Sequence, residues 1–312
     1  MIISASRRTD IPAYYADWFF NRLQDGCVLV RNPMNPHRVS RVALNPAVVD
    51  GFVFWTKNPI PMTDRFALLR EYPYYVQFTL TPYGADVECG LPSKDDVLIP
   101  AFRRLSERVG GDRVVWRYDP ILISERYSVL FHTDAFRRMC DRLAGYTDTC
   151  VISFLDLYRN IQSRIAPLGI TPPTDREAEE IAGSFAETAR EYGISVNTCA
   201  EDGNYSRFGI GHGACIDASR LSRIGGIPLS VGRDKNQRGA CGCAESIDIG
   251  AYHTCTNGCV YCYANHSTAL TARAAAAYDP ASPLLCGHLT DEDVIVEREM
   301  KSCRVEQISL FE

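Results

Sequence analysis

Three cysteines lie within eight residues of one another late in the sequence, in the stretch CTNGCVYC. They are Cys255, Cys259 and Cys262, and thiols held this close together usually bind metal. A structural zinc site needs four ligands, typically from two C-x2-C pairs, and no second such pair accompanies this one. Three thiolates can instead hold three irons of a [4Fe–4S] cluster and leave the fourth iron open to another ligand.

Four further cysteines precede this group. Cys241 and Cys243 form a tight pair whose side chains can reach one site, Cys199 ends a predicted strand, and Cys215 lies in an irregular region. Together they can ligate an auxiliary [4Fe–4S] cluster with all four irons bound by protein. Zinc is the rival, since four thiolates also suit it, and plain buried thiols are the third interpretation.

Composition narrows the class of protein. The chain has 312 residues, 13 cysteines and a net charge of −5, which is not the pattern of a general nucleic-acid binder. No apolar run approaches the length of a membrane span, and the N-terminus lacks the apolar region of a signal peptide. We therefore expect a cytoplasmic protein without membrane partners, whose thiols serve metal binding or packing rather than disulfides.

The elements that must position these cysteines alternate between strands and helices. Apolar runs rich in Val, Ile, Phe and Tyr predict strands at 2–6, 27–32, 51–59, 74–82, 113–120, 149–157 and 193–200. Amphipathic segments lie between several of them, including one with Phe136 and Leu143 on its apolar side and Thr133 as its N-cap. This alternation predicts an α/β fold with a parallel sheet, as a partial or complete (β/α) barrel, with its chemistry at the carboxyl ends of the strands.

The pattern divides the chain into three parts. Residues 1–200 form the barrel core, and residues 201–246 are an irregular, cysteine-rich segment that a function or a cofactor must order. Residues 247–312 then complete the barrel. They begin with the strand-like run SIDIGAY, which overlaps the end of the irregular segment and leads into the three cysteines, and they continue with a helix over 264–278.

The C-x3-C-x2-C spacing, with the aromatic Tyr261 directly before the last cysteine, resembles the signature of the radical S-adenosylmethionine superfamily. The resemblance implies a [4Fe–4S] cluster whose open iron binds S-adenosylmethionine. Reduction then cleaves the sulfonium and produces a 5′-deoxyadenosyl radical that abstracts hydrogen from a substrate. It also implies a (β/α) barrel with the cysteines on the loop after its first strand.

Only 50 residues follow Cys262, too few for a barrel, so the arrangement resembles a circular permutation with the cluster strand placed last. Nearly the whole chain also resembles the domain of unknown function 1848 family, through SASRRTDIPAYY, FWTKNP, WRYDP, KNQRGACGC and DIGAYHTC. That family name implies no activity.

The resemblance to the superfamily suggests residues that contact S-adenosylmethionine. Lys57 and Arg117, at predicted strand ends, are candidates for its carboxylate, or are ordinary ion pairs at the rim of the barrel. Tyr261 would place its backbone near the adenine and its ring against the cofactor, or merely pack the loop. Thr79 and Thr81 can bond the ribose or the amino group.

Other polar residues follow the predicted strands. Arg7 and Arg8 suit an anionic group such as phosphate or carboxylate, or pair with acidic residues of the protein. Asp10 is expected to cap a helix. Asp119 and Asp156 can each act as an acid, a base or a substrate anchor.

These features predict a radical S-adenosylmethionine enzyme acting on an unknown small-molecule, nucleotide or peptide substrate. Its electron donor would be a protein such as flavodoxin or ferredoxin. Two alternatives stay open: a zinc-stabilised binding protein, and an iron–sulfur electron carrier or sensor that does not cleave S-adenosylmethionine.

Overall fold

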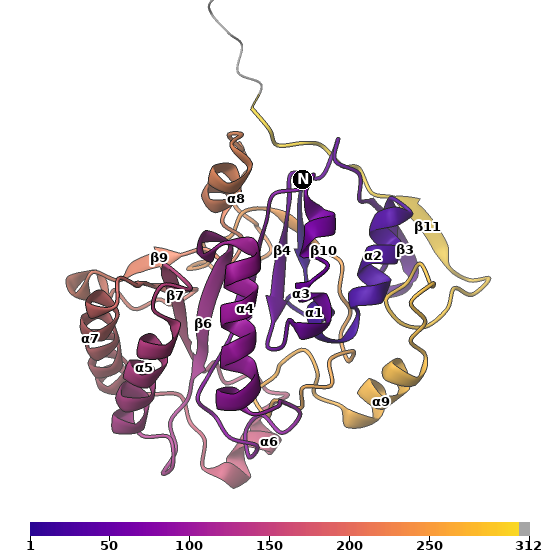
Figure 1. The fold of residues 1–312 in the computed structure, drawn as a ribbon. Helices are drawn as coiled ribbons and strands as arrows, with labels where there is room; N and C mark the ends of the chain where they lie inside the picture. The colour runs from indigo at the N-terminus through magenta and orange to yellow at the C-terminus, as the bar shows by residue number, and fades with distance from the viewer. Residues whose placement is uncertain (306–312) are drawn as a thin grey trace, which may run out of the picture.

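The computed structural model describes residues 1–305, and its centre is a sheet of eight parallel strands (Figure 1). Their spatial order nearly follows the sequence, except that the last strand lies beside the first. In that order they are β10 (Ser246–Asp248), β1 (Ile2–Ala5), β4 (Gly51–Thr56), β5 (Tyr74–Thr79), β6 (Val114–Ile121), β7 (Thr149–Phe154), β8 (Ser195–Cys199) and β9 (Gly211–Gly213). Within residues 1–305 the edge strands β9 and β10 do not pair, so the α/β fold is confirmed without a closed barrel.

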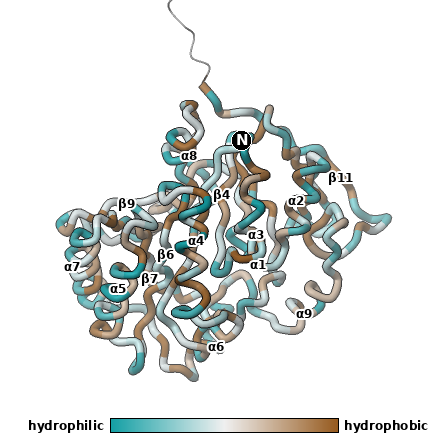
Figure 2. The backbone as a smooth tube through the Cα atoms, viewed as in Figure 1, coloured by the Kyte–Doolittle hydropathy of each residue, from teal (hydrophilic) through white to brown (hydrophobic). Residues whose placement is uncertain are grey.

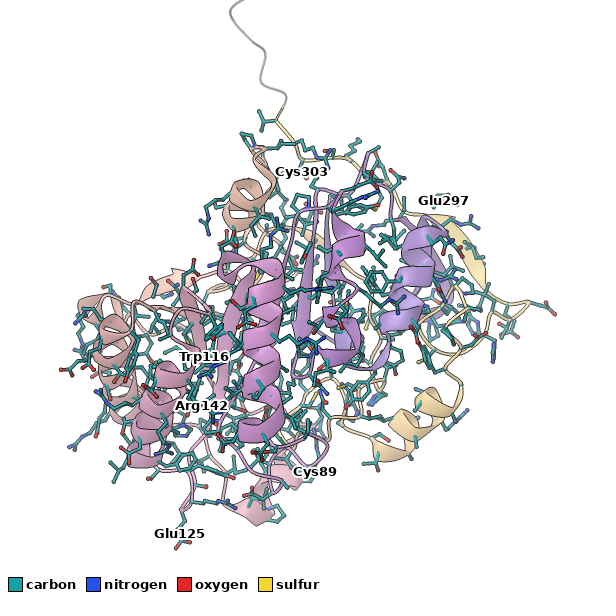
Figure 3. All side chains as sticks on the ribbon, in the orientation of Figure 1. Cys89, Trp116, Glu125, Arg142, Glu297 and Cys303 are labelled. Atoms are coloured by element: carbon teal, nitrogen blue, oxygen red, sulfur yellow. The ribbon has the colours of Figure 1, made fainter. Side chains whose placement is uncertain are left out.

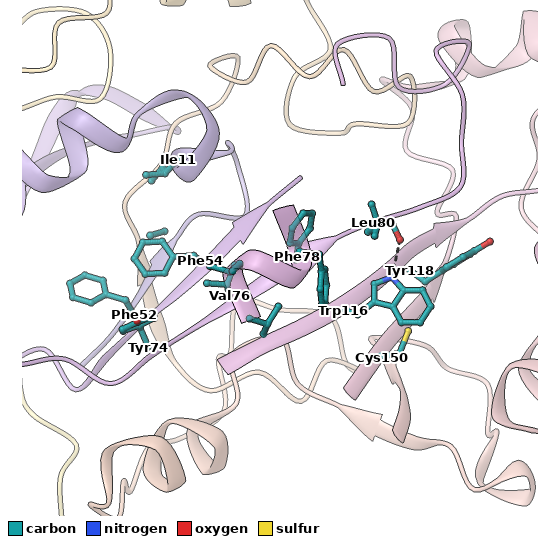
Figure 4. Close-up of a cluster of buried hydrophobic side chains, with 14 of the residues drawn as sticks. Ile11, Phe52, Phe54, Tyr74, Val76, Phe78, Leu80, Trp116, Tyr118 and Cys150 are labelled. Atoms are coloured by element: carbon teal, nitrogen blue, oxygen red, sulfur yellow. Dashed lines mark hydrogen bonds between the residues drawn. The ribbon is translucent and has the colours of Figure 1, made fainter. Parts of the chain in front are cut away.

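Helices cover one face of the sheet, because alternate strand residues are large and apolar. Phe52, Phe54 and Trp116 belong to this buried cluster, and the Trp116 Nε1–H donates to the carbonyl of Leu80 at 2.9 Å (Figure 4). Hydrophilic and hydrophobic residues alternate along the covering helices, as for α4 in Figure 2. All the α-helices of residues 1–305, on either face or beside the sheet, are α1 (Ile11–Tyr14), α2 (Ala16–Gln24), α3 (Ile60–Thr63), α4 (Ile99–Val109), α5 (Val129–Leu143), α6 (Gln162–Ile165), α7 (Asp175–Glu191), α8 (Ala218–Gly225) and α9 (Thr268–Ala276).

The opposite face of the sheet is covered by the segment predicted to be irregular. Val53, Tyr75 and Val115 point to this side and pack with Ile216 and Leu221. The segment contains the helix α8 and the strand β9, so it is more regular than the sequence suggested. Apolar burial orders it, and its three cysteines belong to the same buried cluster together with Cys199 of β8.

Some local predictions were wrong. The run 27–32 forms β2 (Cys27–Asn32), which does not join the main sheet but pairs in a separate sheet with β3 (Asn35–Ala43), to which β11 (Val294–Glu297) also pairs. The helix α5 begins before Thr133, and its N-cap is Ser128, whose side chain accepts from the Phe131 N–H. The predicted helix over 264–278 is the shorter α9. In the part of the chain that is described, no helix is both long and apolar enough to cross a bilayer.

His132, on α5, is a buried histidine with a hydrogen-bond partner on each ring nitrogen. Its Nε2 lies 2.7 Å from the carbonyl oxygen of Leu122, which can only accept, so this nitrogen carries the proton. Its Nδ1 lies 2.8 Å from the Tyr118 hydroxyl and therefore accepts. Burial lowers the pKa of His132 to about 4, because the imidazolium would lose its hydration there.

We expect this histidine to make the fold sensitive to acid. The unfolded chain takes up a proton near pH 6.5 but the folded chain only near 4, so stability present above pH 6.5 is lost as the pH falls between these values. The group should cost about 2 kcal/mol between pH 7 and pH 5. Urea unfolding at both pH values should show this difference for the wild type but not for His132→Gln. An equal change in the free energy of unfolding between pH 7 and pH 5 for the two proteins would contradict the assignment.

Candidate functional site

All seven clustered cysteines line one cavity of about 720 Å³ at the carboxyl ends of the strands. Lys57, Thr79, Arg117 and Tyr261 line it too, whereas Thr81 is buried outside its lining. The cavity therefore brings together two sets of thiols from separate parts of the chain. These are the three-cysteine loop at 255–262 and the second set, which comprises Cys199, Cys215, Cys241 and Cys243.

Asp10 connects the three-cysteine loop to β1 and β4 of the parallel sheet. Its carboxylate accepts from the Ala13 N–H at 3.0 Å, which confirms the predicted N-cap of α1. It also accepts from the Lys57 backbone N–H at 2.7 Å and from the Asn257 side-chain amide at 3.2 Å. One buried carboxylate thus fixes the loop after β1, the end of β4 and the cysteine loop relative to one another.

Arg164, on α6, holds the other side of the three-cysteine loop. Its guanidinium donates to the backbone carbonyls of Cys259 at 3.1 Å, Cys262 at 2.6 Å and Asn265 at 3.4 Å. The Asn265 side chain in turn accepts from the Cys255 N–H at 2.9 Å. Sequence reasoning missed Arg164, because no motif marks it and its partners lie 95 to 101 positions away in the sequence.

The segment after β5 packs closely against the loop. The Gly90 N–H donates to the Asn257 carbonyl at 2.9 Å, and the Val260 N–H donates to the Val87 carbonyl at 3.0 Å. Gly258 adopts a φ of +68°, and a Cβ there would lie 2.5 Å from the Cys89 Sγ. Cys89 lies at the end of the molecule near α6 in Figure 3. The loop therefore needs a glycine at 258 both for its conformation and for space.

Replacing Gly258 by Ala should destabilise the protein by about 1–3 kcal/mol, because it adds left-handed backbone strain to a steric clash. The control is Gly232→Ala, where a Cβ meets nothing within 4 Å and φ is not positive. Adding Cys89→Ala to Gly258→Ala should recover the part due to the clash. Urea unfolding of the apoprotein measures all three. Equal stability of the two single variants would disprove the strained-loop account.

Glu88 is the centre of a buried polar network that sequence reasoning also missed. Its carboxylate accepts from the Lys57 Nζ at 2.7 Å and from the Thr81 hydroxyl at 2.9 Å. The Tyr261 hydroxyl and the Lys94 ammonium complete its contacts. Burial alone would raise the pKa of Glu88, but the positive charges of Lys57 and Lys94 outweigh it and hold the pKa at about 2.

This network changes the interpretation of three predicted residues. Lys57, Thr81 and Tyr261 do meet, but on a carboxylate of the protein beside the three-cysteine loop. The Lys57 ammonium also lies 5.5 Å from the centre of the Tyr261 ring. Thr79 lines the cavity at the end of β5.

Arg117 lies with the second cysteine set instead. Its guanidinium donates to the Cys215 Sγ at 3.1 Å and to Asp119 at 3.0 Å. Asp119 also accepts from the Ser153 hydroxyl, and Asp156 pairs with Arg238 at 2.7 Å. Neither aspartate is thus free of partners.

The thiols of the second set lie in one buried cluster. The Sγ atoms of Cys199 and Cys215 are 2.6 Å apart, and Cys241 and Cys243 are buried in the same cluster, where the Cys243 Sγ accepts from the Ile216 N–H at 3.4 Å. In residues 1–305, no three His, Cys, Asp or Glu side chains converge as they would on a single bound metal ion. Both sets nevertheless offer only thiols, the donors that iron–sulfur clusters use, and the four thiols of the second set also suit zinc.

Comparison with known proteins gives one match. The family described as Domain of unknown function (DUF1848) matches residues 2–264, which include both cysteine sets. Searches of curated proteins and of solved structures found no match. The match covers most of the 312 residues, from β1 through the three-cysteine loop. The chain therefore belongs to the DUF1848 family.

Proposed function

We propose that this protein is a radical S-adenosylmethionine enzyme whose [4Fe–4S] cluster is held by Cys255, Cys259 and Cys262. The observation that carries the proposal is the three-thiol loop itself. It lies at the carboxyl ends of parallel strands, faces a cavity of about 720 Å³, and is anchored by Asp10, Arg164 and the segment around Glu88. The vacant fourth position of a three-thiol cluster would face that cavity.

The strand order supports a partial (β/α) barrel of the radical S-adenosylmethionine type, in permuted form. β10 leads into the three-cysteine loop and lies at the edge of the sheet beside β1. Read across the sheet, the cluster strand comes first and the other strands follow in sequence order. This is the arrangement that a circular permutation would produce.

The residues around the loop position it and control its charge. When bound, the cluster supplies an electron that cleaves the sulfonium of S-adenosylmethionine. Arg164 and Asp10 keep the loop in one conformation. Glu88 with Lys57 and Lys94 leaves one net positive charge beside the loop, which favours an anionic cluster and the carboxylate of the cosubstrate.

For the second cysteine set we propose an auxiliary [4Fe–4S] cluster. Arg117 would stabilise its thiolates, since the guanidinium already contacts the Cys215 Sγ. Zinc is the alternative, favoured by four thiols buried in one cluster. The physiological electron donor would be a protein such as flavodoxin or ferredoxin.

Anaerobic reconstitution tests the proposal. We expect brown protein with about eight irons per chain, or about four if the second set binds zinc. After reduction with dithionite, S-adenosylmethionine should yield 5′-deoxyadenosine. Colourless protein with zinc alone would indicate a binding protein, and clusters without 5′-deoxyadenosine would indicate an electron carrier or sensor. Either result would refute the proposed function.

A further inference from the structure

Arg7 and Arg8, which follow β1, are the cations of the cavity that lack close partners. Their side chains are only 19% and 25% exposed, yet neither guanidinium donates a hydrogen bond to any residue in 1–305. The nearest carboxylates are Asp234, at 3.6 Å from Arg7, and Asp248, at 4.0 Å from Arg8. Both distances exceed that of a hydrogen bond.

Those two carboxylates are already engaged elsewhere. Asp248 accepts from the hydroxyls of Ser4 at 2.7 Å and Ser6 at 2.6 Å, and from the backbone N–H groups of Arg7 at 2.9 Å and Gly250 at 3.0 Å. Asp234 accepts from the N–H of Asn236 at 2.9 Å and the side-chain amide of Gln237 at 3.2 Å. Four donors thus occupy the Asp248 carboxylate, and each oxygen of Asp234 already has one donor.

The other cations that line the cavity have carboxylate partners at hydrogen-bond distance. Lys57 contacts Glu88 at 2.7 Å, Arg117 contacts Asp119 at 3.0 Å, and Arg238 contacts Asp156 at 2.7 Å. The unsatisfied donors therefore gather at the two neighbouring arginines. Guanidinium groups bind phosphate and carboxylate in bidentate geometry, so an anion is the ligand that this pair lacks.

The position of Arg7 places such an anion between the two cysteine sets. Tyr263 directly follows Cys262 in the sequence, and its hydroxyl donates to the Arg7 carbonyl at 3.2 Å. Asp234, whose carboxylate lies 3.6 Å from the Arg7 guanidinium, donates its backbone N–H to the Cys243 carbonyl at 2.9 Å, so the guanidinium lies near the second set as well. Arg8 lies 5.1 Å from the centre of the Tyr252 ring, which leaves its hydrogen-bonding edge free.

We propose that Arg7 and Arg8 form a subsite that binds an anionic group of the substrate, a phosphate or a carboxylate, between the two cysteine sets. The inference rests on the proposed function and specifies the charge of the substrate of that same site. It excludes a neutral substrate, and it gives the arginines a role separate from cleavage of S-adenosylmethionine.

Anion binding to the full-length reconstituted protein tests this subsite. Inorganic phosphate, pyrophosphate and succinate serve as probes in isothermal titration calorimetry. At least one should bind to the wild type, and Arg7→Gln and Arg8→Gln should each weaken it tenfold or more. Arg176→Gln, an exposed arginine on α7 outside the cavity, should leave the affinity unchanged. No binding of any probe, or equal weakening by the control, would overturn the proposal.

S-adenosylmethionine also carries a carboxylate, so its affinity is measured in parallel. We expect both variants to bind it as the wild type does, because the proposed subsite serves the substrate and not the cosubstrate. A loss of S-adenosylmethionine affinity with unchanged binding of the probes would assign the arginines to the cosubstrate and refute the substrate subsite. Because the calorimetry does not require turnover, failure of the proposed function would show separately, as absent 5′-deoxyadenosine.

A second test uses only the wild-type protein, so it does not depend on whether the arginine variants fold. Phenylglyoxal modifies accessible arginines, and peptide mapping locates the adducts. Arg7 and Arg8 should be modified in the free protein and protected by a saturating concentration of the bound probe. Arg176 should react equally with and without the probe. Unprotected Arg7 and Arg8 would contradict the proposal.

Discussion

Replacing Cys259 by Ala is expected to abolish formation of 5′-deoxyadenosine and to lower the iron content from about eight to about four per chain. Cys259 is the buried middle cysteine of the three-cysteine loop, and two thiols would not retain the proposed [4Fe–4S] cluster. Replacing Cys241 in the second set should also remove about four irons, but it should leave uncoupled cleavage of S-adenosylmethionine within a few-fold of the wild type. Iron analysis and chromatography of the nucleoside measure both effects.

Cys303 provides the matched control for these cysteine variants. In Figure 3 it lies at the opposite end of the molecule from Cys89, which contacts the three-cysteine loop at Gly258, and it does not line the cavity. Cys303→Ala should keep all the iron and full activity. Persistent 5′-deoxyadenosine from Cys259→Ala would disprove the ligand assignment. Equal inactivation by Cys241→Ala would show that the two sets do not act as separate centres.

The cysteine sets could be predicted because their spacing is a local property of the chain. Cys255, Cys259 and Cys262 occupy one loop, so no knowledge of the fold is needed to place them together. The strands of the sheet were likewise predictable from their apolar residues, which the helices and the segment 215–244 bury from both sides. Residues 27–32 show the limit, because an apolar strand pattern does not identify the sheet that the strand will join.

The residues that hold the site could not be predicted, since their partners are distant in sequence. Glu88 is 31 residues from Lys57 and 173 from Tyr261, and no spacing rule connects them. Arg117 illustrates a different difficulty. A side chain at a strand end can face any part of the cavity rim, and here the packing of the segment around Cys215 decides that Arg117 meets the second set.

Glu88 should be the residue whose neutralisation most affects stability. Its carboxylate is fully buried, while the side chains of Lys57 and Lys94 are 12% and 18% exposed. Glu88→Gln keeps the shape but leaves two ammonium groups near each other without a counter-charge. Breaking a buried ion pair in this way costs about 3–5 kcal/mol, because the remaining charge stays poorly solvated. Urea unfolding of the apoprotein at pH 7 measures the loss.

A second substitution separates this charge effect from a packing effect. In Glu88→Gln/Lys94→Met one of the two cations is removed, so the double variant should be more stable than Glu88→Gln alone, by about 1–3 kcal/mol. Glu107→Gln, at an exposed position on α4, should change stability by less than about 0.5 kcal/mol. If the double variant were less stable than the single one, the cost would arise from lost hydrogen bonds and packing. The two lysines would then not depend on Glu88 for their charge balance. That result would contradict the net positive charge assigned to Glu88, Lys57 and Lys94 beside the three-cysteine loop.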